Sequence, residues 1–156
     1  MIVGLDALVA ELRHERDGFF EALSAVSPES LTTPGLIGEW SAREIIAHLG
    51  YWAGHAVEAI HAVEQDRIEP GEPDTDAVNE TVARVARSTD LATVRKREAA
   101  SFEVLVERLQ ALDPALLATE LPEGDTLLEA VRGDGPDHYR EHAEQLRQVL
   151  GEPVRG

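Results

Sequence analysis

The hydrophobic residues of the chain recur at intervals of three and four over several long stretches, which is the period of amphipathic α-helices. The first stretch covers residues 5–26 and should end before Pro28. The last begins at Gly135-Pro136, where proline suits the first helical turn, and ends near Gly151. No segment alternates with the period of two that is typical of strands. The pattern therefore predicts an all-α protein.

The second helix has the clearest start signal. Ser41 and Glu44 have the spacing of a capping box, and Trp40 and Ile45 have the spacing of a hydrophobic staple. The helical period then continues to about Gln65, after which a segment rich in proline and glycine stops it. We expect this helix to begin directly after Ser41.

A third helical region covers residues 74–112, and a new cap at residues 88–90 predicts a break or kink inside it. A short helix is expected at residues 125–131, before the last long one. Helices with apolar stripes must bury them against one another. The simplest architecture is an antiparallel four-helix bundle with one short extra helix before the last helix, in a single domain at residues 1–156.

Composition excludes several classes of protein. Subtracting 30 Asp and Glu from 14 Lys and Arg gives a formal charge of -16, which would repel nucleic acids and anionic lipid surfaces. No apolar run has the length of a membrane-spanning helix, and no secretion signal is recognisable, so we expect a cytoplasmic protein. The chain has no cysteine, so any metal must be held by histidine and carboxylate side chains.

Three of the six histidines form a candidate metal site. His138 and His142 are spaced i, i+4 in the last helix, so they share a face and could share an ion. That face borders the apolar stripe that contains Tyr139 and Leu146. In the second helix, His48 lies among core positions and should point inward. Three neutral imidazoles that leave a fourth position free suit a catalytic zinc-type ion.

The other histidines fit this site less well. His55 lies two turns after His48, about 10.5 Å along the axis, so it could only support the ligands from outside. His14 and His61 should be exposed to solvent. A simpler explanation also exists for the candidate ligands, because inward histidines are often hydrogen-bonded core residues and i, i+4 pairs arise by chance.

The segment from Gly38 to Trp52, which includes Trp-Ser and His48-Leu49, together with the His-x-x-x-His of the last helix, resembles the DinB-like (DinB/YfiT) superfamily of metalloenzymes. The resemblance implies a four-helix bundle and one divalent ion, Zn or Ni, held by His48, His138 and His142. Isomerase-like relatives often have glutamate at the position of His138, so the intact histidine trio points away from them. Asp76 and Asn79 weakly resemble an Asp-x-x-Asn element of some relatives, and a helix start is the better explanation of these residues.

The related groups include mycothiol-dependent maleylpyruvate isomerases and ClbS/DfsB-like proteins, so the resemblance implies two kinds of chemistry. One is transfer of a low-molecular-weight thiol to a small electrophile, which we favour. The other is hydrolysis of a reactive small molecule. A rival class is a non-enzymatic helical bundle that forms a homodimer, with the histidines serving only the structure.

Two further residues are candidates for the chemistry. Glu141 lies between the ligands of the last helix and could act as a general base, since residues 138–142 also satisfy the H-x-x-E-H pattern of some zinc peptidases. A peptidase is disfavoured because His48 already completes the site. Arg16 lies on the stripe of the first helix and could bind a substrate carboxylate, although a surface arginine that covers apolar area would look the same.

Overall fold

The computed structural model describes residues 4–71 and 74–151, which are helices joined by turns and loops. Within this part of the chain no β-strand is present, so the expectation of an all-α fold is confirmed. The helices are α1 (Leu5–Leu23), α2 (Ala42–Glu64), α3 (Thr75–Arg87), α4 (Leu91–Ala111), α5 (Leu127–Asp134) and α6 (Pro136–Val149), with short 3-10 turns at Pro28–Ser30 and Pro114–Ala118.

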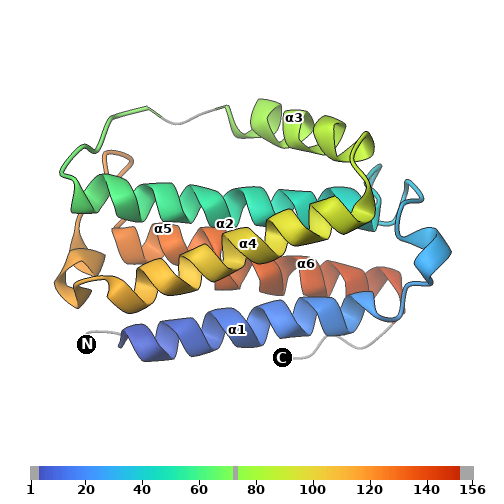
Figure 1. Ribbon diagram of the computed structural model, residues 1–156, viewed down its shortest axis with the longest axis horizontal. Coiled ribbons are helices and arrows are strands. Elements are labelled where there is room, and N and C mark those ends of the chain that lie inside the picture. Colours follow the sequence, from blue (N-terminus) through green and yellow to red (C-terminus); the bar gives the residue numbers. More distant parts are fainter. Residues whose placement is uncertain (1–3, 72–73, 152–156) are drawn as a thin grey trace.

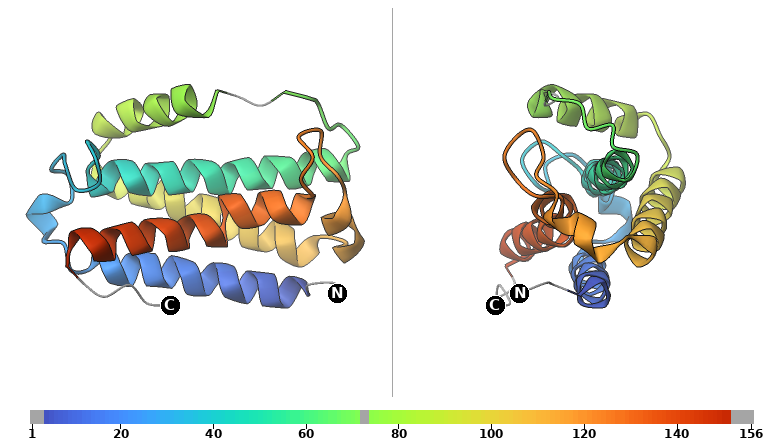
Figure 2. Two further views of the ribbon diagram at one scale, coloured as in Figure 1. Left: turned by 180° about the vertical axis from the view of Figure 1, so that it is seen from behind. Right: turned by 90° about the vertical axis from the view of Figure 1, so that its left-hand side faces the viewer.

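The long helices lie side by side around a common interior. Helices α1, α2, α4 and the α5–α6 run have their axes roughly aligned (Figure 1). An end-on view shows them arranged around a common centre (Figure 2). Within this arrangement α2 packs on α4, and α1 packs on α6. Helix α3 lies outside the others and packs on α2. It covers one end of α2.

The break expected at residues 88–90 separates α3 from α4. Asp90 caps α4, since its carboxylate accepts a hydrogen bond of 3.0 Å from the backbone N–H of Thr93. The start predicted for α2 is also confirmed, because the buried Glu44 carboxylate accepts from the backbone N–H of Ser41 at 3.3 Å and from its hydroxyl at 3.0 Å. The other oxygen of Glu44 pairs with Arg87 at 3.1 Å, which ties the end of α3 to the start of α2.

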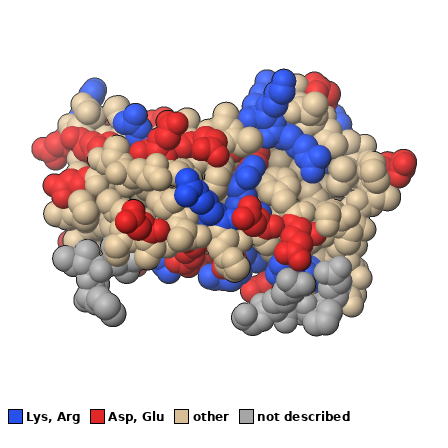
Figure 3. All heavy atoms as spheres, turned by 60° about the horizontal axis from the view of Figure 1, so that its bottom comes forward, with Lys and Arg blue, Asp and Glu red and all other residues tan. Residues whose placement is uncertain are grey.

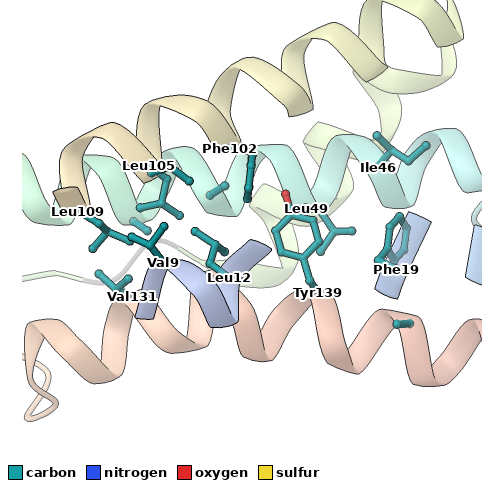
Figure 4. Packing of buried hydrophobic residues seen from close by; sticks show 14 of the residues in the cluster. Val9, Leu12, Phe19, Ile46, Leu49, Phe102, Leu105, Leu109, Val131 and Tyr139 are labelled. Carbon is teal, nitrogen blue, oxygen red and sulfur yellow. The ribbon is translucent and has the colours of Figure 1, made fainter. Parts of the chain in front are cut away.

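One hydrophobic cluster draws side chains from all the long helices. Figure 4 shows Tyr139 of α6 reaching into this cluster, with its hydroxyl directed toward α4. The labelled side chains around it are apolar and close-packed, as protein interiors are. They are Val9, Leu12, Phe19, Ile46, Leu49, Phe102, Leu105, Leu109 and Val131.

Helices α2 and α4 approach most tightly at Gly50. A Cβ atom built at Gly50 would lie 2.9 Å from the Cα and 3.2 Å from the Cβ of Glu98. Both are atoms that a side-chain rotation cannot move. Glycine at this position therefore sets the distance between the two helices, two residues after His48.

On the face that Figure 3 shows, acidic and basic side chains are interspersed. In the described part of the chain, no helix combines the length and the apolar character that crossing a bilayer requires.

Candidate metal centre

The structure brings His48, His138 and His142 together between α2 and α6. The Nε2 atoms of His48 and His138 are 2.8 Å apart. The ring of His142 lies 5.1 Å from the ring of His48 and 4.8 Å from that of His138, measured between centroids. One ligand atom from each histidine lies within 4.8 Å of the others, so the three could hold a metal ion.

Local geometry at the start of α6 places His138 at this point. Pro136 occupies the first helical turn, which matches its fixed φ and its missing N–H. The preceding Gly135 separates α5 from α6, and a Cβ there would lie 2.9 Å from the carbonyl oxygen of Val131 and 3.3 Å from Leu12 of α1. A larger residue would clash with the backbone of α5 and would shift the junction from which α6 and its histidine pair begin.

Burial holds the cluster in its neutral form. Desolvation, reinforced by the neighbouring imidazoles, lowers the pKa of His48 to about 4 and that of His138 to about 3. Burial also lowers the pKa of His142, although a hydrogen bond to Gln145 opposes this effect. Imidazolium cannot bind a metal, so all three groups are in the form that a ligand requires at pH 7.

A hydrogen bond orients one of the three rings. The Nδ1 of His142 is 2.7 Å from the side-chain oxygen of Gln145, so Nδ1 donates and Nε2 keeps its lone pair. The buried Nδ1 atoms of His48 and His138 have no partner among the described residues. The bond from His142 to Gln145 is of the supporting kind that metal-binding histidines usually have.

The donor set fits a divalent ion of the zinc type. Tetrahedral ligands at about 2.1 Å from a metal are about 3.4 Å from one another. The separation of 2.8 Å between two Nε2 atoms and the upper limit of 4.8 Å for the set bracket that value, so small side-chain movements would suffice. Neutral imidazole is a ligand for several divalent transition metals.

The histidines line an open cavity of about 510 Å³. Trp40 forms part of its wall, with a ring centroid 5.1 Å from that of His48. Asn79 of α3 also lines the cavity and accepts a hydrogen bond of 2.8 Å from the indole N–H of Trp52. The match of Asn79 to the family element therefore falls at the site, whereas Asp76 is exposed and does not line the cavity.

The two other predicted site residues have different places. Glu141 is exposed and lines the same cavity as the histidines. Arg16 is half-buried between α1 and α4, where its guanidinium binds the buried Glu98 through bonds of 2.9 and 2.7 Å. It also packs over the rings of Phe20 and Phe102. Arg16 thus pairs with a carboxylate of the protein itself, and its role in substrate binding stays a prediction.

The remaining histidines agree with the sequence reasoning. His14 and His61 are exposed. His55 lies outside the trio, and its Nδ1 is 2.6 Å from the carboxylate of Asp134, which raises the pKa of His55. Asp134 lines the metal cavity and was not predicted, because no sequence spacing links residues 55 and 134.

These features define an all-helical protein with three convergent histidines between two of its helices. The family model of the DinB superfamily matches residues 11–147, and the chain belongs to this family. The crystal structure of the mycothiol-dependent maleylpyruvate isomerase has the same fold, with a TM-score of 0.74 and 17% sequence identity. The likeness covers 92% of this chain and 61% of the isomerase chain. No curated protein matches the sequence significantly.

Proposed function

We propose that the protein is a metal-dependent enzyme that transfers a low-molecular-weight thiol to a small electrophile. The observation that carries the proposal is the convergence of three neutral histidines at the wall of an open cavity. Such a set leaves a coordination position for a reactant. The family and the shared fold with a mycothiol-dependent isomerase agree with it. The bundle in this proposal consists of α1, α2, α4 and α6, with α3 and α5 added to it.

The residues of the chain have distinct roles in the proposed reaction. A divalent ion bound here would supply acidification of a thiol or water and polarisation of a carbonyl. His48, His138 and His142 would hold the ion. Trp40 packs against His48, with the two rings tilted by 55°, and restricts the movement of the imidazole. No cysteine of the protein is needed, because the small-molecule thiol is the nucleophile.

Hydrolysis is the second candidate, and the position of Glu141 favours it. This carboxylate lies at the cavity wall beside the histidines, where it could accept a proton from water. In the thiol reaction the same carboxylate could accept the thiol proton. Glu141 is therefore the candidate proton acceptor in both reactions.

Elemental analysis of the purified protein tests the metal centre. We expect about one divalent ion per chain, Zn or Ni, because each histidine supplies one ligand atom. His142→Ala should abolish metal binding. His55→Ala should leave the metal content unchanged, because His55 binds Asp134 instead. The reverse result would contradict the ligand assignment.

A turnover assay separates the functions. The metal-loaded protein is incubated with a panel of electrophiles, with and without mycothiol, bacillithiol or glutathione, and adduct formation and hydrolysis are followed separately. Thiol-dependent adduct formation supports the transferase, and turnover without thiol supports the hydrolase. If fully loaded protein is inactive over the whole panel, the non-enzymatic dimeric bundle is favoured, which the oligomeric state would then test. The proposal places this reaction in the cytoplasm, the compartment expected from the sequence.

A further inference from the structure

A second cavity, of about 390 Å³, adjoins the metal cavity. It lies among the C-terminal half of α2, residues 68–71 that follow it, the start of α3, helix α5 and the loop at residues 119–126. The two cavities have part of their walls in common, so a molecule that fills the second cavity reaches the edge of the first. The shared wall residues are Trp52, Thr75, Gly133 and Asp134.

The walls of this second cavity are apolar on one side and polar on another. Trp52, Ala59, Leu121 and Ala130 supply apolar surface. At the boundary with the metal cavity, Nδ1 of His55 and the carboxylate of Asp134 are joined by a hydrogen bond of 2.6 Å. The ring of His55 packs against that of Trp52, with centroids 4.9 Å apart, which fixes the position of both rings.

The charge of the cavity is negative. Besides Asp134, the carboxylates of Glu69, Glu123, Asp125 and Glu129 line it, and no lining residue among those described is Lys or Arg. In the described part of the chain, none of these four carboxylates forms an ion pair with Lys or Arg. A cavity whose walls have one sign of charge concentrates ligands of the opposite sign.

We infer that this second cavity binds the organic part of the substrate, and that the substrate is an amine-bearing organic cation with a small apolar body. The ammonium group lies against Glu123 and Asp125, and the apolar body packs on Trp52. The reactive end then extends past Asp134 toward the histidines. The inference rests on the proposed function for the reaction itself, since it names the substrate class of the same site.

The negative charge of the cavity walls disfavours the binding of anionic substrates. A carboxylate or phosphate placed in this cavity would be repelled by its acidic side chains and would find only His55 as a cationic partner, already engaged with Asp134. A neutral alcohol would be accepted by the apolar wall without electrostatic gain. Charge should therefore decide the order of affinities among ligands of equal shape.

Three probes of similar shape test this order: phenethylamine, 2-phenylethanol and phenylacetate. The chain has two tryptophans, and their indole N–H signals in ¹H–¹⁵N NMR spectra report on different places. Trp52 lines both cavities, whereas Trp40 lines only the metal cavity. We expect phenethylamine to shift the Trp52 signal first, with an affinity at least about tenfold above that of phenylacetate.

A charge-neutral variant supplies the control. Glu123→Gln combined with Asp125→Asn should weaken phenethylamine binding about tenfold and should leave 2-phenylethanol binding unchanged. Glu120→Gln removes one charge from an exposed residue of the same loop that does not line the cavity, and it should have little effect. If both variants lose a comparable amount of phenethylamine affinity, the preference for the amine comes from the overall net charge of -16 and not from this cavity. That result would overturn the inference.

Two other outcomes would also overturn it: equal affinity for the amine and the alcohol, or shifts at Trp40 without shifts at Trp52. The titrations are run on metal-loaded and metal-free protein, with metal content measured in each sample. Amine binding that depends on Glu123 and Asp125 in a protein that takes up no metal would support this cavity and contradict the proposed function. Full metal loading without amine binding would contradict the role of this cavity and would leave the proposed function standing.

Discussion

Gln145 and His142 are joined by a hydrogen bond of 2.7 Å between the side-chain oxygen of Gln145 and Nδ1 of His142. The two residues lie one turn apart in α6, so the helix itself aligns them. The bond selects the tautomer in which Nε2 carries the lone pair. Because His48 and His138 lack such a partner among the described residues, Gln145 should dominate the orientation of the ligand set.

Gln145→Ala should therefore weaken metal binding. Loss of a hydrogen bond that orients a ligand typically lowers metal affinity about 10- to 100-fold. Affinity for Zn²⁺ is measured by competition with a chromophoric chelator. Gln148→Ala, an exposed glutamine of the same helix, is the matched control and should leave the affinity unchanged. Equal affinities in all three proteins would show that the hydrogen bond does not support the ligand.

The stability of the metal-free protein should depend on pH through the buried histidines. The pKa of His48 is lowered to about 4, so the folded protein binds fewer protons than the unfolded chain, where the value is about 6.5. Stability is then complete above about pH 6.5 and is lost as pH falls toward 4. Between pH 7 and pH 5, His48 alone should account for a loss of about 2 kcal/mol.

Urea unfolding at pH 7 and pH 5, in the presence of a chelator, measures this loss. His48→Gln should make the decrease in the free energy of unfolding smaller by about 2 kcal/mol. His61→Gln, at an exposed position of the same helix, should keep the pH dependence of the parent. A parent protein equally stable at both pH values would contradict the assignment of buried neutral histidines.

Periodicity and capping signals were sufficient to predict the helices and the points at which α2 and α4 begin. The Ser41–Glu44 box and the cap at Asp90 are local, so their residue types alone predict where α2 and α4 begin. Boundaries without such signals were less accurate, since α1 ends at Leu23 rather than near residue 26. The short helix expected at residues 125–131 is α5, which extends to Asp134.

Contacts between distant residues could not be predicted. Glu98 resembles an ordinary helix-surface residue in the sequence, yet it is 1% exposed and accepts hydrogen bonds from Arg16 and Tyr139. The pairing of His55 with Asp134 depends in the same way on how α2 meets α5. Helical period places a residue on a face of its own helix, but it does not say which residue of another helix that face meets.

The close approach of α2 and α4 gives a prediction on stability. Gly50→Ala would place a methyl group 2.9 Å from the Cα of Glu98, and the backbone must move to accept it. We expect a loss of about 1–3 kcal/mol, which is typical of overpacking a core. Thermal and urea unfolding measure it.

Gly54→Ala is the matched control, one turn further along α2. The nearest atom to its Cβ outside its own helix is Oγ of Ser101 at 3.9 Å, an ordinary contact. Alanine has the higher helix propensity, so this variant should be as stable as the parent or more stable by up to about 1 kcal/mol. Equal effects at both positions would mean that propensity, and not the contact with α4, determines the result.

The hydroxyl of Tyr139 donates a hydrogen bond of 2.5 Å to Glu98 in the core. Burial, together with this carboxylate, raises the pKa of Tyr139, so the hydroxyl remains a donor throughout the neutral range. Tyr139→Phe removes the donor and keeps the ring, and it leaves Glu98 with Arg16 as its charged partner. Hydrogen bonds to charged groups contribute about 1.5–3 kcal/mol, and we expect a loss of this size in urea unfolding. Tyr51→Phe, at a side chain that is 41% exposed, should change stability little. If the two variants unfold alike, the Tyr139–Glu98 bond does not stabilise the packing of α6 against α4.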